Sequence, residues 1–131
     1  MTRALAYLDT SAFAKLPLHE PERAALLHAL ETYTPVSSWL LAVEAVRACA
    51  RYGRDYADAA RAGLERVSLL PLDEQILRRA QMLPPPQLRT LDALHLATAL
   101  SIAADLAVLV TYDDRLAEAA TAAGVTVIAP C

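Results

Sequence analysis

Four acidic residues lie at places along the chain where their carboxylates could do chemistry together. They are Asp9, Glu44, Asp92 and Asp113. Asp9 directly follows an apolar run at residues 4–8, and Asp113 follows another at 106–111. Crowded carboxylates repel one another unless a cation lies among them, and hard oxygen ligands suit Mg²⁺ or Mn²⁺. Such a centre can hold one or two metal ions, activate water and stabilise charge on a phosphate.

The two acids that follow apolar runs also have an ordinary structural interpretation. Asp9 is suited to a turn or a helix cap, and Asp113 to the N-cap of the next helix. Asp114 stands beside Asp113 and is the more usual cap candidate. Taken singly, therefore, neither Asp9 nor Asp113 identifies a catalytic site.

The other two acids fall within expected helices. Asp92 lies in a first turn, where it interacts well with the helix dipole, and His95 on the same face favours a structural hydrogen bond. Glu44 shares a helix face with Arg47 and Arg51, which favours an exposed ion pair. Neighbouring leucines on that face argue instead for partial burial of Glu44, and the spacing leaves both interpretations open.

The elements that must position these acids alternate between strands and helices. Strands are expected at 4–8, around Val36, and at 67–70, 106–111 and 125–128. Helices are expected at 21–33, from Ser37 or Ser38 to about Tyr52, and at 55–66, 74–82, 91–104 and 114–123, with a short one capped by Thr10 or Ser11. This alternation predicts an α/β fold with a mostly parallel sheet of about five strands flanked by helices. Ligand sites in such sheets lie beyond the carboxyl ends of the strands.

Composition limits the possible classes of protein. The 131 residues suit a single domain over 1–131, and 56% hydrophobic with 21% charged residues excludes a disordered chain. A net charge of −3 gives no global basic field for collecting nucleic acid. Cys49 and Cys131 form no metal or disulfide motif, so core or surface thiols are expected. We expect neither a signal peptide nor a membrane span, and hence a cytoplasmic protein.

Four sequence words around the acids resemble the PIN-domain nucleases and, among these, the VapC-type toxins of bacterial toxin–antitoxin pairs. The words are LDTSAFAKL, SSWLLAVEAVRA, LRTLDALHLATAL and LVTYDDRLAEAATAAGVTVI. They occur in the order and spacing of that family and together span nearly the whole chain. Trp39, which is bulkier than usual, and the Pro84–Pro86 triplet depart from the pattern without touching an acid.

The resemblance implies a Mg²⁺- or Mn²⁺-dependent endoribonuclease whose products carry a 5′-phosphate and a 3′-hydroxyl. All four acids would be catalytic and would form the metal site. Asp9, Asp92 and Asp113 would ligate metal most directly. Glu44 would ligate through water or position the attacking water.

Auxiliary residues also follow from the resemblance. Thr10 and Thr111 would orient the carboxylates through hydrogen bonds. Asp114 could replace or assist Asp113 as a ligand. His95 belongs to one of the four words and would be structural.

Partners are implied as well. Arg47, Arg51 and Arg54 recur at helical spacing beyond Glu44, as a solvated face or, with Lys15, as a basic rim for RNA phosphates. The resemblance implies a homodimer that a cognate antitoxin inhibits by covering the active edge. We expect the antitoxin to contact the Leu-rich helix at 21–33 and the adjoining segment KLPLHEPE.

Other function classes are weaker or remain open. A haloacid-dehalogenase-like phosphatase needs a second Asp where Ser11 stands, and the chain contains no G-x-x-x-x-G-K-S/T or G-x-G-x-x-G phosphate loop. The same chemistry could serve RNA maturation or decay without an antitoxin. A non-catalytic binding module of this fold is the third class, and a complete set of four acids speaks against it.

Overall fold

A computed structural model describes residues 3–131 and contains a five-stranded sheet in which every pairing is parallel. The strand order is β3-β2-β1-β4-β5. The strands are β1 (Ala4–Leu8), β2 (Tyr33–Ser38), β3 (Ser68–Leu70), β4 (Leu106–Val110) and β5 (Val127–Ile128). The predicted α/β fold with a parallel sheet of five strands is confirmed.

The strand order creates a crevice between β1 and β4. The chain builds the sheet outward from β1 to β3, then returns to place β4 on the other side of β1. Within this pair, Tyr7 lies opposite Leu109 and Leu8 opposite Val110. Because the direction of growth reverses here, the connections leaving the two strands diverge and open a site at the sheet's carboxyl edge.

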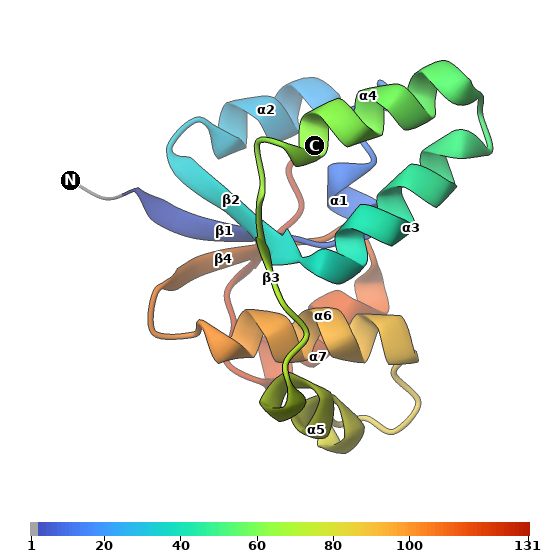
Figure 1. Cartoon of the computed structure of the whole chain (residues 1–131). Coiled ribbons are helices and arrows are strands. Elements are labelled where there is room, and N and C mark those ends of the chain that lie inside the picture. Colours follow the sequence, from blue (N-terminus) through green and yellow to red (C-terminus); the bar gives the residue numbers. More distant parts are fainter. Residues whose placement is uncertain (1–2) are drawn as a thin grey trace.

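Helices cover both faces of the sheet (Figure 1). One face carries α1 (Thr10–Phe13), α2 (Arg23–Leu30), α3 (Trp39–Ala50) and α4 (Arg54–Leu64), and the other carries α5 (Glu74–Met82), α6 (Thr90–Ser101) and α7 (Asp114–Ala122). Successive side chains of β1 point to opposite faces of the sheet. Ala6 and Leu8 pack into the core cluster on one face, and Tyr7 packs into the cluster on the other. Burial on both faces explains why β1 and β4 are continuous apolar runs.

Helix α6 is central, as its apolar sequence predicts. Its buried residues are Ala93 and every residue from His95 to Leu100. No helix among residues 3–131 is long and apolar enough to cross a membrane. The two cysteines are free thiols, with Cys49 buried and Cys131 exposed, in agreement with expectation.

The helix expected at 21–33 is shorter, and the prediction of its end is wrong. Pro21 lies outside α2, which ends at Leu30, and Tyr33 instead begins β2, where it pairs with Ala4. An aromatic residue followed by β-branched Thr34 and Val36 favours a strand, and pairing along β1 overrides the helical spacing of Tyr33. The ends of the other elements differ from expectation by a few residues.

Two helices are capped by acids rather than by the neighbours that the sequence favours. Asp9, and not Thr10 or Ser11, caps α1 by accepting from the Ala12 backbone N–H. Asp113, and not Asp114, caps α7 in the same way. Both capping residues have extended backbone conformations directly before a helix, where a carboxylate also meets the positive end of the helix dipole.

Candidate active site

Three acids gather at the β1–β4 switch point. Asp9 follows β1, Asp113 lies shortly after β4, and Asp92 is in the first turn of α6. Thr111 joins two of them. Its hydroxyl donates to Asp9 Oδ2 at 2.6 Å and accepts from the Asp113 backbone N–H at 3.1 Å. The contact is of the orienting kind that the sequence words imply for Thr111.

Asp9 is the most enclosed of the three, with 3% of its surface exposed. Burial raises the pKa of its carboxyl, and hydrogen bonds from Thr111, Ala12 and Ser11 act in the opposite direction. The Ser11 hydroxyl lies 2.8 and 2.9 Å from the two carboxylate oxygens, and it accepts from the Tyr112 backbone N–H at 2.9 Å. Ser11 is therefore a site residue that the sequence analysis did not single out, although its place two residues after a capping Asp was visible.

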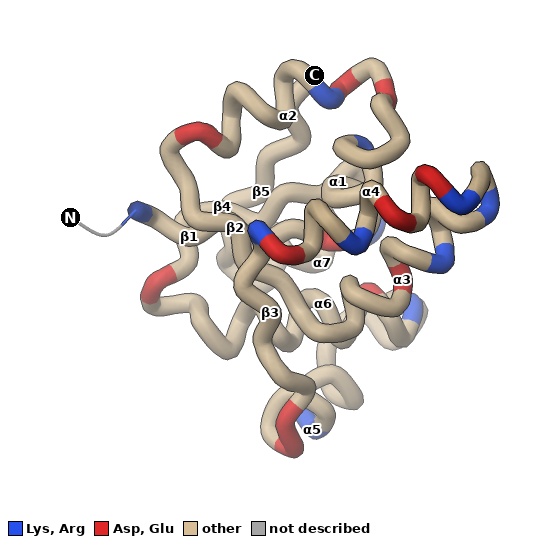
Figure 2. The backbone as a smooth tube through the Cα atoms, turned by 45° about the horizontal axis from the view of Figure 1, so that its top comes forward, with Lys and Arg blue, Asp and Glu red and all other residues tan. Residues whose placement is uncertain are grey.

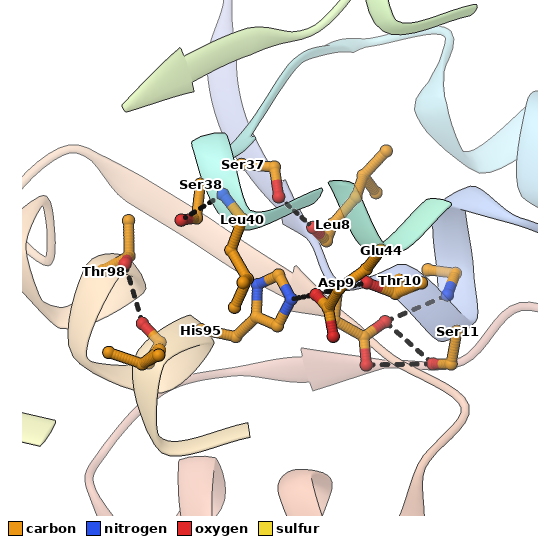
Figure 3. Close-up of polar contacts among 12 residues, drawn as sticks. Leu8, Asp9, Thr10, Ser11, Ser37, Ser38, Leu40, Glu44, His95 and Thr98 are labelled. Atoms are coloured by element: carbon orange, nitrogen blue, oxygen red, sulfur yellow. Dashed lines mark hydrogen bonds and ion pairs between the residues drawn. The ribbon is translucent and has the colours of Figure 1, made fainter. Parts of the chain in front are cut away.

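Glu44 points into the same region from α3, together with the side chains of Asp9 and His95 (Figure 3). Its Oε1 accepts from the Thr10 hydroxyl at 2.7 Å and lies 2.7 Å from His95 Nε2. On the other side of the ring, Nδ1 lies 2.7 Å from the Tyr7 hydroxyl. Four residues from four elements, Tyr7, His95, Glu44 and Thr10, thus form one continuous hydrogen-bonded chain.

Of the two interpretations left open for Glu44, partial burial is confirmed: its side chain is 18% exposed and pairs with His95 rather than with Arg47 or Arg51. His95 is structural as expected, but its partners are Tyr7 and Glu44 rather than the nearby acid Asp92. Local helical spacing shows the arginines beside Glu44, whereas the actual partners come from other elements.

Asp92 and Asp113 share a different partner, Arg89. The guanidinium Nε lies 3.6 Å from Asp92 Oδ2, and Nη2 donates to Asp113 Oδ2 at 3.1 Å. Burial raises the pKa of Asp92, the charge of Asp113 raises it further, and Arg89 opposes both effects. Arg89 also escaped the sequence analysis, although its position three residues before Asp92, at the start of an expected helix, was a signal.

The donors at this edge are all carboxylate and hydroxyl oxygens, which suits Mg²⁺ or Mn²⁺ rather than softer metals. The mutual repulsion that raises the pKa of Asp92 is the electrostatic condition that a cation would relieve. As the side chains stand, no three acidic, His or Cys side chains within residues 3–131 converge on one metal position. Hydrogen bonds and Arg89 already engage the oxygens of Asp9 and Asp113. The residues fit a metal ion that would replace some of these contacts.

The residues expected at the basic rim have different surroundings. Lys15 forms an ion pair with Glu22 at 3.0 Å, and its ammonium lies over the Tyr112 ring, 4.9 Å from the centroid. Arg47, Arg51 and Arg54 are exposed where α3 ends and α4 begins, and none forms an ion pair in the described part of the chain. Figure 2 shows blue segments gathered at this end of the two helices.

Comparison with known proteins decides the family. A family model described as the PIN domain matches residues 6–122. This chain belongs to the PIN domain family. Among its relatives, Ribonuclease VapC46 from Mycobacterium tuberculosis is 47% identical over 128 residues, covering 97% of this chain and 98% of the relative.

Solved structures of other PIN-type proteins share the fold. The crystal structure of VapC20 from M. tuberculosis, a toxin that cleaves the sarcin–ricin loop, superposes with a TM-score of 0.75 at 18% identity, covering 95% of this chain and 99% of that one. A toxin–antitoxin complex from Klebsiella pneumoniae gives a TM-score of 0.66 at 23% identity, with coverages of 82% and 86%.

Proposed function

We propose that this PIN-domain protein is a Mg²⁺- or Mn²⁺-dependent endoribonuclease that acts as the toxin of a toxin–antitoxin pair. The observation that carries the proposal is the gathering of Asp9, Asp92 and Asp113 at the switch point, with Glu44 held beside them by His95. The similarity to Ribonuclease VapC46 supports RNA as the substrate. The shared fold with a toxin and with a toxin–antitoxin complex is consistent with an antitoxin partner.

The roles follow from the contacts of each side chain. Asp9, Asp92 and Asp113 would hold the metal, while Glu44 would position water. Bound Mg²⁺ or Mn²⁺ would supply positive charge for the phosphate and lower the pKa of a water molecule.

Smaller roles go to residues that orient these carboxylates. The hydroxyl of Thr111 fixes one oxygen of Asp9, and that of Thr10 fixes one oxygen of Glu44. Asp114 is exposed in the first turn of α7, and we propose it as an assistant to Asp113. The two hydroxyl contacts restrict the orientations of the Asp9 and Glu44 carboxylates before substrate arrives, which favours preorganised catalysis.

Cleavage of a structured RNA tests this function directly. The wild-type chain should cut the RNA with Mg²⁺ or Mn²⁺ and leave it intact in EDTA. The products should carry a 5′-phosphate and a 3′-hydroxyl. A protein that is inert with both metals would contradict the proposal.

The exposed arginines at the α3–α4 end should guide RNA through its phosphates. Replacing Arg51→Glu together with Arg54→Glu should raise the RNA concentration needed for half-maximal cleavage by roughly tenfold, because two phosphate contacts become repulsive. The matched control reverses two exposed arginines of α5, Arg78→Glu with Arg79→Glu. Unchanged cleavage in the first variant, or an equal loss in the control, would rule out a specific basic rim.

The antitoxin should cover the apolar groove beside α2. This groove of about 420 Å³ lies between α2 and α4, and Leu16, Pro17, Leu27, Leu30, Ala62 and Val67 are among the residues that line it. Half-exposed Leu27 is a suitable anchor for an apolar helix. In hydrogen exchange, the amides of α2 should exchange more slowly in the complex with the cognate antitoxin than in the free toxin. Equal exchange rates at α2 would place the antitoxin elsewhere.

We further propose that residues 1–131 act as one domain and pair into a homodimer. Exposed apolar side chains on α3 are consistent with such an interface, since Trp39 is 56% and Val43 59% exposed. Isolated apolar side chains are common on monomers, but two of this size one helical turn apart form a small patch.

A further inference from the structure

The guanidinium of Arg89 contacts two of the proposed metal ligands at once. It lies 3.1 Å from Asp113 Oδ2 and 3.6 Å from Asp92 Oδ2. No other Lys, Arg or His forms an ion pair with either acid within residues 3–131. One side chain therefore supplies the positive charge that keeps this carboxylate pair together.

A metal ion would compete with Arg89 for the same oxygen. Asp113 has two oxygens, and Oδ1 already accepts from the Leu116 backbone N–H at 2.9 Å as the cap of α7. The remaining oxygen, Oδ2, is the one that Arg89 occupies. A metal ion bound at Oδ2 would place its positive charge beside that of the guanidinium, and the repulsion between the two cations favours the release of Arg89.

The side chain of Arg89 is free to change its conformation. Its side chain is 67% exposed, whereas those of Asp92 and Asp113 are 18% and 24% exposed. It is the residue directly before α6, and its side chain makes no cap bond with that helix. An exposed ion pair is weak and exchanges partners readily, while the carboxylates stay in place.

We propose that Arg89 is a positioning residue that exchanges partners: it holds Asp92 and Asp113 in the metal-free protein and passes to an RNA phosphate when a divalent metal takes Asp113. This inference rests on the proposed metal-dependent ribonuclease function. Released at the rim of the site, a guanidinium is well suited to a phosphate, with which it can form two parallel hydrogen bonds.

Metal affinity tests the first half of the exchange without any RNA. Titration calorimetry with Mn²⁺ alone should show Arg89→Ala binding about two- to fivefold more tightly than wild type, the range expected for removal of an exposed competing ion pair. Arg89→Lys, which keeps the charge but cannot fork between two carboxylates, should lie between them. The matched control is Arg78→Ala, which removes an exposed arginine paired with Glu74 on α5 and should bind Mn²⁺ like wild type.

The salt dependence of RNA cleavage tests the second half. At saturating Mn²⁺, Arg89→Ala should raise KM and reduce the slope of log KM against log salt by about 0.7, the value for one lost phosphate contact on a single strand. Arg78→Ala should change neither quantity.

The outcomes separate this inference from the proposed function. If wild type binds no Mn²⁺, the metal site itself is refuted and the exchange with it. If wild type binds Mn²⁺ but Arg89→Ala binds equally or more weakly, the competition is refuted while the metal site stands. Tighter Mn²⁺ binding with an unchanged KM and slope would refute the transfer of Arg89 to phosphate.

Discussion

Replacing Asp9→Asn should reduce metal-dependent RNA cleavage by about 100-fold or more, because even an outer-shell partner of a metal site contributes about 10–100-fold. Asn preserves the shape of the side chain and can still accept from the Ala12 N–H as the cap of α1. Ser11 and Thr111 can rotate their hydroxyls to accept from the new amide. The substitution thus removes one charge and one metal ligand while the local fold survives. Initial cleavage rates at equal Mn²⁺ concentration measure the loss.

Although Asp9→Asn reduces cleavage, it should increase the stability of the metal-free protein, measured in EDTA, at higher pH. Burial raises the pKa of Asp9, so the folded chain holds a proton over a pH range where the unfolded chain has lost it. The contribution of this group is therefore present at low pH and is lost as the pH rises through its folded pKa. The Asp9→Asn variant lacks this loss. Its free energy of unfolding relative to wild type should therefore increase as the pH rises above the ordinary range of an aspartate pKa.

A second capping aspartate provides the control. Asp73 caps α5 by accepting from the Ile76 backbone N–H, but it lies outside the site. Asp73→Asn should leave cleavage unchanged. Full activity in Asp9→Asn, or a comparable loss in Asp73→Asn, would contradict the role given to Asp9.

The location of the site could be predicted from sequence because topology determines it. Apolar runs that alternate with helices imply a parallel sheet, and Asp9 and Asp113 follow two such runs. The same two residues turned out to cap helices, so their structural and proposed catalytic interpretations do not exclude each other. The two oxygens of Asp113 have different partners: Oδ1 accepts the capping bond from Leu116, and Oδ2 accepts from Arg89.

The surroundings of Glu44 could not be predicted in this way. Its partner His95 is 51 positions away, and His95 meets Tyr7 across 88 positions. Helical spacing shows only neighbours on the same helix, so it offers Arg47 and Arg51 as partners of an exposed Glu44 and no partner for a half-buried one. Only the packing of α3 and α6 against β1 brings these three residues together.

The imidazole of His95 has a hydrogen-bond partner at each of its two ring nitrogens. Burial raises the pKa of Tyr7, which keeps its hydroxyl protonated and able to donate to Nδ1. In the tautomer that accepts at Nδ1, the ring hydrogen lies on Nε2, where it is donated to Glu44. The ring therefore transmits the fixed position of Tyr7 to Glu44.

His95→Ala should consequently destabilise the protein by about 3–5 kcal/mol, because it leaves a cavity and removes one hydrogen-bond partner each from buried Tyr7 and half-buried Glu44. Denaturant unfolding measures this cost. His95 is 1% exposed, so water does not readily replace the ring. A lower stability of His95→Ala would show that His95 supports the fold. It would not show whether His95 also positions Glu44.

Two conservative variants separate packing from positioning. His95→Gln places an amide where Nε2 meets Glu44, whereas His95→Asn places one where Nδ1 meets Tyr7. If His95 positions Glu44, the Gln variant should retain about tenfold more kcat than the Asn variant, with similar KM, since misplacing one catalytic group raises the barrier by about 1.4 kcal/mol. Equal kcat values in two folded variants would show that Glu44 keeps its orientation through Thr10 alone. A higher kcat in the Gln variant would place the buried imidazole in the catalytic architecture of the site, although it touches neither metal nor RNA.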